Sequence, residues 1–87
     1  MKTKLLSLFC VHNGPLYREW RGETENGNFV VVRDVATEIQ LGIDEREFNA
    51  IWKGSTMFVK EAPGFISINS ILDYLSFIPP DDFIDFI

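Results

Sequence analysis

The sequence predicts an α+β fold: a small antiparallel sheet, built from an N-terminal three-stranded meander and a later hairpin, packed by two or three short helices. Two observations favour this class. The first third of the chain holds short segments rich in β-branched and aromatic residues, separated by turn signals. From residue 35 onward, apolar residues recur at helical spacing between residues that begin and end helices. A chain of 87 residues makes one domain, residues 1–87.

Three strands are expected before residue 33. Residues 4–11 are apolar and suit a buried strand, and the Asn-Gly-Pro of residues 13–15 signals a turn. In residues 16–22 two mixed sets of side chains alternate along the chain, a pattern consistent with a second strand. Asn26-Gly27 is a strong hairpin signal, and the β-branched residues 29–32 follow it as a third strand. These segments together predict an antiparallel meander.

Two helices are expected next. Asp34 can cap a helix over residues 35–41, which Gly42 would end. Asp44 can begin a second helix, because Glu47 three residues later completes an Asp-headed capping box. Apolar residues then recur with the i, i+3, i+4 spacing of an inward face, and Gly54 would end the helix.

The last third predicts a hairpin and a third helix. Residues 56–60 and 65–68 flank a Pro-Gly turn, so they are expected to pair. Asn69 or Ser70 can cap a helix over residues 71–78, which the two prolines at 79 and 80 would terminate. Residues 79–87 are expected to form an acidic and aromatic tail, either docked on the core or free.

The charge of the chain is distributed unevenly. The net charge is −5, and all eight basic residues lie at or before Lys60. After Lys60 come five acidic residues and no basic one: Glu61, Asp73, Asp81, Asp82 and Asp85. An acidic, strongly apolar C-terminus suits a surface that meets another protein, and it repels nucleic acid and anionic membranes.

Catalytic and metal chemistry have little support. Cys10 and His12 would share one face of a strand, but neighbours on one strand rarely converge on a reacting atom, and no third group orients the imidazole. One Cys and one His do not make a zinc site, and Asp81, Asp82 and Asp85 lack the spacing of a calcium loop. We therefore expect a protein that is not an enzyme and needs no cofactor. With no membrane span, signal peptide or disulfide expected, the expected location is the cytoplasm.

The sequence pattern also suggests two alternative functions, both in nucleic-acid binding. Residues 35–52 have the outline of a helix-turn-helix with the later hairpin as a wing, and residues 33–68 resemble winged-helix domains in this respect. The expected recognition helix, however, begins with Asp44, Glu45 and Glu47, which oppose phosphate. Arg18, Arg21 and Arg33 lie among aromatic residues, as on sheets that stack single strands. Because glutamates share that hairpin, a mixed-charge solvated face is the favoured interpretation.

The function expected from the sequence is inhibition of a protein partner that has a basic cleft, of the kind found in enzymes that process nucleic acid. Toxin-immunity proteins and phage anti-defence proteins share this profile of a small, acidic, non-catalytic domain. The expected contacts are the carboxylates of Asp81, Asp82 and Asp85 with Phe83 and Phe86 as anchors. A second candidate surface comprises Asp44, Glu45 and Glu47. A homodimer is a further alternative, because a domain this small buries little of its surface.

Overall fold

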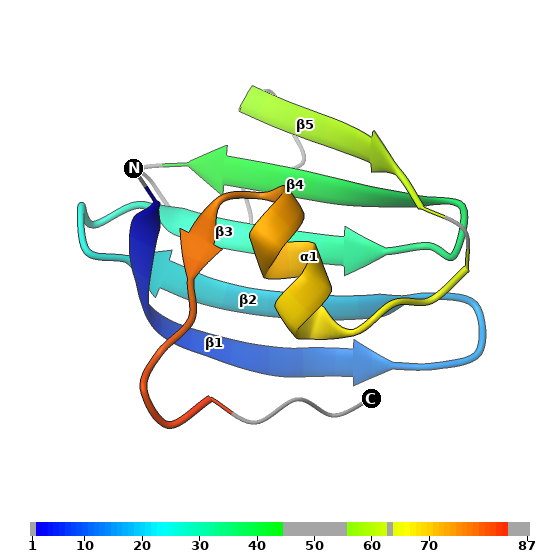
Figure 1. Cartoon of the computed structure of the whole chain (residues 1–87), viewed down its shortest axis with the longest axis horizontal. Coiled ribbons are helices and arrows are strands. Elements are labelled where there is room, and N and C mark those ends of the chain that lie inside the picture. Colours follow the sequence, from blue (N-terminus) through cyan, green and yellow to red (C-terminus); the bar gives the residue numbers. More distant parts are fainter. Residues whose placement is uncertain (1, 45–55, 63, 84–87) are drawn as a thin grey trace.

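A computed structural model describes residues 2–44, 56–62 and 64–83 of the chain (Figure 1). These residues contain six strands and one short helix. The elements are β1 (Thr3–Asn13), β2 (Arg18–Thr24), β3 (Phe29–Asp34), β4 (Glu38–Asp44), β5 (Thr56–Glu61), α1 (Ile68–Tyr74) and β6 (Phe77–Ile78). The strands form one curled sheet in the order β5-β4-β3-β2-β1-β6. Neighbouring strands are antiparallel except for β6, which runs parallel to β1.

The predicted meander is part of this sheet. β1 pairs with β2 through a ladder that contains two register shifts, and β2 pairs with β3 in regular register. The hairpin turn forms at the Asn-Gly signal: Gly27 has a φ of +84°, and its N–H donates to the carbonyl oxygen of Thr24 at 3.0 Å. Glycine and asparagine favour this turn because left-handed backbone costs them little.

The predicted α+β class is wrong, because the described chain is mostly strand and has one short helix instead of two or three. The first predicted helix is replaced by β4. Residues 38–44 alternate with a period of two, so that Ile39, Leu41 and Ile43 share one face of the sheet. Asp34 does not cap a helix: its Oδ1 accepts the N–H of Ala36, which turns the chain back with a φ of 71°.

Strand β4 also removes the helix-turn-helix. Asp44 is the last residue of β4 and is buried, so it does not begin a helix in the way predicted. The rest of the second predicted helix lies outside the described residues. The predicted hairpin is wrong as well, because β5 pairs with β4, and residues 65–67 form no strand. The winged-helix interpretation therefore has no structural basis in the described chain.

The one described helix is displaced from its predicted position. Ser67 caps α1 by accepting the N–H of Ser70 at 3.2 Å, so the helix begins before the expected caps. It ends at Leu75, and the following Ser76 has a φ of 59°, which turns the chain into β6. Phe77 and Ile78, predicted to be helical, pair instead with Thr3 and Lys4 of β1.

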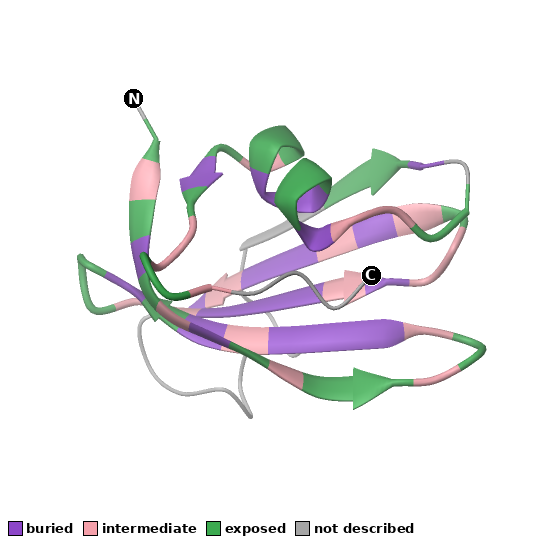
Figure 2. Ribbon diagram, turned by 60° about the horizontal axis from the view of Figure 1, so that its bottom comes forward, coloured by how far each residue is buried: buried purple, intermediate pink, exposed green. Residues whose placement is uncertain are grey.

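The core lies between the inner face of the curled sheet and α1 (Figure 2). Trp20, Val32 and Leu41 lie opposite one another on β2, β3 and β4, and all three are buried. The helix contributes Ile68, Ile71 and Leu72, all almost fully buried. Burial of side chains of this size stabilises a fold by about 1.5–3 kcal/mol each. The one described helix therefore covers the middle of the sheet's core face.

Gly22 of β2 permits the close approach of β1. A Cβ at this position would lie 2.0 Å from the carbonyl oxygen of Ser7, so the strands would have to separate. We expect Gly22→Ala to lower the free energy of unfolding by about 1–3 kcal/mol, as overpacking does. Urea unfolding followed by tryptophan fluorescence measures this change.

The matched control for this prediction is Gly27→Asn in the β2–β3 turn. Nothing lies within 4 Å of a Cβ at Gly27, and asparagine tolerates its left-handed backbone. The control should lose much less stability than Gly22→Ala. Equal losses would contradict the steric argument.

Candidate functional site

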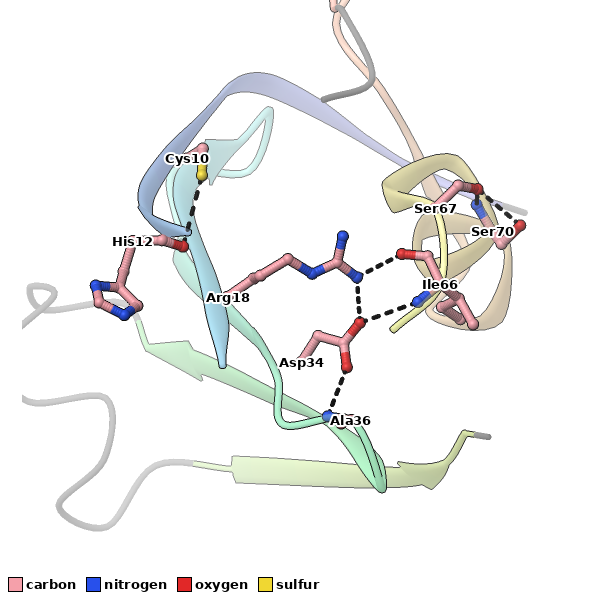
Figure 3. A network of polar contacts seen from close by, with 8 residues as sticks. All are labelled: Cys10, His12, Arg18, Asp34, Ala36, Ile66, Ser67 and Ser70. Atoms are coloured by element: carbon pink, nitrogen blue, oxygen red, sulfur yellow. Dashed lines mark hydrogen bonds and ion pairs between the residues drawn. The ribbon is translucent and has the colours of Figure 1, made fainter. Parts of the chain in front are cut away.

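A buried ion pair holds the segment before α1 against the sheet (Figure 3). Arg18 of β2 donates from Nη2 to Oδ2 of Asp34 at the end of β3, and both side chains are buried. The same nitrogen donates to the carbonyl oxygen of Ile66 at 2.5 Å. Asp34 Oδ2 in turn accepts the N–H of Ile66 at 3.4 Å. These contacts are structural, because they compensate both charges away from the surface.

The other two arginines of the predicted cluster are also paired with a carboxylate. Glu19 is buried and accepts from Arg33 at 2.6 Å and from Arg21 at 3.0 Å. The guanidinium of Arg33 also lies 5.2 Å from the ring centroid of Tyr17. Each arginine that the single-strand alternative requires therefore pairs with an acidic side chain. This arrangement lowers the positive potential that a nucleic-acid backbone would need.

Cys10 and His12 do not form a catalytic pair. The Cys10 thiol donates to the backbone oxygen of His12 at 3.6 Å, while the imidazole points away from the sulfur (Figure 3). That imidazole stacks on Tyr17 with the ring centroids 4.1 Å apart. Across the part of the chain that the structure describes, no three His, Cys, Asp or Glu residues are grouped so that they could hold a metal ion.

The feature most suited to binding is a groove along β1, which we name the β1 groove. It has a volume of about 300 Å³ and is lined by Leu6, Ser7, Leu8, Phe9, Pro80, Asp82 and Phe83. Leu6 is 58% exposed, Phe9 65% and Val11, further along β1, 50%. Exposed apolar side chains gathered at one place mark an interaction surface more often than scattered ones do.

The chain after β6 forms the second wall of the groove. The Phe83 N–H donates to the carbonyl oxygen of Pro80 at 3.0 Å, which closes a turn that exposes Asp81 and Asp82. Phe83 is partly buried and packs against the core. The structure thus brings together three predicted site residues, with the carboxylates at the surface beside a docked aromatic ring.

The other predicted site residues divide into two groups. Asp44 is only 5% exposed, so little of its carboxylate can reach a partner. Glu45, Glu47, Asp85 and Phe86 lie outside the described residues. The apolar wall of the β1 groove was missed, because residues 4–11 were interpreted as a buried strand. The signal was available: a continuous apolar run must expose alternate residues when only one face of its sheet is covered.

Substitution of Phe83 tests whether the second wall of the β1 groove, formed by the chain after β6, packs on the core. Because the ring is partly buried against the core, Phe83→Ala should lower the free energy of unfolding by about 1–2 kcal/mol, less than for a fully buried phenylalanine. Asp82→Asn, in the same turn but exposed, should leave it unchanged. Chemical unfolding of the two variants measures both free energies of unfolding. A Phe83→Ala protein as stable as the parent would mean that the ring does not pack on the core.

No protein-family model, no curated protein and no solved structure matches the chain. Among the described residues no helix has the length and apolar character needed to cross a membrane. The site is therefore characterised by its own geometry: an exposed apolar groove along β1, with the exposed Asp82 in its lining and the exposed Asp81 next to Asp82 in the chain.

Proposed function

We propose that this chain is a small, non-enzymatic, cytoplasmic inhibitor that binds a basic protein through the β1 groove and its acidic rim. The observation that carries the proposal is that the exposed Asp82 lines the same groove as the exposed side chains of Leu6 and Phe9, with the exposed Asp81 next to it in the chain. An apolar centre with charged groups at its edge is the common anatomy of a protein–protein interface. Inhibition would follow when the bound chain covers a functional cleft of the partner.

The apolar part of the groove supplies an anchor site. Phe9 lies on the β1–β2 ladder opposite Arg21, and Leu6 lies at a register shift of the same strand, so β1 presents both side chains from a backbone that is already ordered. Ordering the backbone therefore adds little to the cost of binding. A few residues that are well packed and fully desolvated at the centre of an interface account for most measured binding energy. A partner side chain that enters the β1 groove would contact both of its walls.

Charge argues for a basic partner. Four of the eight basic residues, Lys2, Arg18, Arg21 and Arg33, are already in ion pairs with acidic residues of the chain. The exposed carboxylates of Asp81 and Asp82 have no such partner among the described ion pairs. Complementary fields can raise association rates above the neutral range of about 10⁵–10⁶ M⁻¹s⁻¹. Enzymes that process nucleic acid present such basic clefts, which suits a toxin-immunity or anti-defence role.

Charge reversal in the rim tests the proposal. Asp81→Lys combined with Asp82→Lys should weaken partner binding by at least about tenfold, because like charges then face each other across the interface. Glu23→Lys combined with Glu61→Lys makes the same change in net charge at exposed sites outside the groove and serves as the control. Thermal melting checks that both variants are folded.

The measurement is capture from a lysate followed by an activity assay on the captured protein. We expect a basic enzyme that is retained by the parent and by the control, lost from the rim variant, and inhibited when the parent is added. Equal capture by all three proteins would contradict the assignment of the rim. A chain that binds only itself, seen as a dimer by light scattering, would contradict the inhibitor function and support the homodimer alternative.

A further inference from the structure

A second groove, separate from the β1 groove, lies between α1 and the edge strand β5. Its volume is about 360 Å³. Its apolar lining comes from Leu41 and Ile43 of β4, Val59 of β5, and Leu75 and Phe77, which follow the helix. Lys60 of β5 and Tyr74 of α1 also line it. A mainly apolar groove with a few polar groups is the usual character of a small-molecule site.

The connectivity of the chain explains why this groove is open. The helix passes through Leu75 and Ser76 directly into β6, which pairs with β1 at the edge of the sheet farthest from β5. At its other end the segment before α1 is held by Arg18 and Asp34 of β2 and β3. Between these attachments α1 lies over the middle of the sheet (Figure 1), and because the sheet is curled, Phe77 of β6 lines the same groove as Lys60 of β5. The inner side of β4 and β5 is left partly uncovered beside the helix.

Lys60 gives the groove a positive charge. It lies opposite the buried Ile39 in the β4–β5 ladder, so it faces the inner side of the sheet, while the adjacent Glu61 faces the other side. Its Nζ lies 5.3 Å from the ring centroid of Tyr74 and is in none of the ion pairs of the described chain. In a protein with a net charge of −5, this cation lies beside an apolar surface.

We propose that this groove binds a small amphipathic anion, a carboxylate with an apolar chain. The chain would lie on Leu41, Leu75 and Phe77, and the carboxylate would pair with the Lys60 ammonium. A water molecule takes about 30 Å³ of liquid volume, so the groove has room for about a dozen non-hydrogen atoms. A medium-chain fatty acid such as octanoate has this size and this distribution of charge.

The test is a titration of the full-length protein with sodium octanoate below its micelle concentration, followed by amide chemical shifts. We expect saturable shifts at Leu41, Ile43 and Phe77. Lys60→Gln should weaken binding by up to about fivefold, the range of an exposed ion pair, and Lys60→Arg should retain it. Lys4→Gln is the control, because it removes an exposed cation of β1 that does not line the groove.

A cationic probe with the same chain separates charge recognition from general apolar binding. Octyltrimethylammonium should bind the parent protein more weakly than octanoate does. Three results would each overturn the proposal: shifts that do not saturate, octanoate affinity that is the same in Lys60→Gln and Lys4→Gln, or equal affinity for the two probes. Because Lys60 lies outside the β1 groove, none of these results bears on the proposed inhibition of a protein partner.

Discussion

The buried ion pair between Arg18 and Asp34 is the constraint on which the arrangement of α1 depends. It joins β2 and β3 to the backbone of Ile66, directly before the helix. An unpaired charge at either position would be costly in the core, so the two residues and the backbone of Ile66 must come together when the chain folds. The ring of Phe65 lies 4.9 Å from the Arg18 guanidinium and helps to exclude water from it. Once this segment is fixed, Ile68, Ile71 and Leu72 reach the core.

The two candidate sites are consequences of how one helix covers a six-stranded sheet. The helix and its attachments cover the middle of the inner face, so apolar surface of β4 and β5 remains open beside the helix. On β1, Phe9 alternates with the buried Leu8 and lies opposite Arg21, so it is exposed on the outer face. At the β1 edge this surface is bordered by carboxylates, and at the β5 edge by an ammonium group. The exposed apolar surface at the β1 edge therefore suits a basic protein, and the exposed apolar surface at the β5 edge suits a small anion. In both proposals the charge of the rim would set the specificity, and the apolar groove would supply the contact area.

The parts of the fold that were predictable from the sequence are those fixed by local chemistry. The meander follows from β-branched runs and from the Asn-Gly turn, which act within a few residues. Strand β4 was mispredicted because Asp34 and Gly42 imitate helix caps, whereas Asp34 in fact binds Ile66, 32 residues later. No local pattern reveals such a contact. The acidic rim could be predicted from composition. Exposed apolar residues on β1 could have been expected from the continuous apolar run over residues 4–11, but the open edge beside them depends on β6 pairing with only Thr3 and Lys4.

Amide hydrogen exchange in an Asp34→Asn variant tests the central claim most directly. If the ion pair is what holds α1 on the sheet, the amides of Ile71 and Leu75, which are hydrogen-bonded within the helix, should lose far more protection than those in the middle of β2 and β3. Arg18→Met combined with Asp34→Leu, which removes both charges, should restore part of the protection. Undiminished protection of α1 in Asp34→Asn, or an equal loss in helix and sheet, would contradict the account.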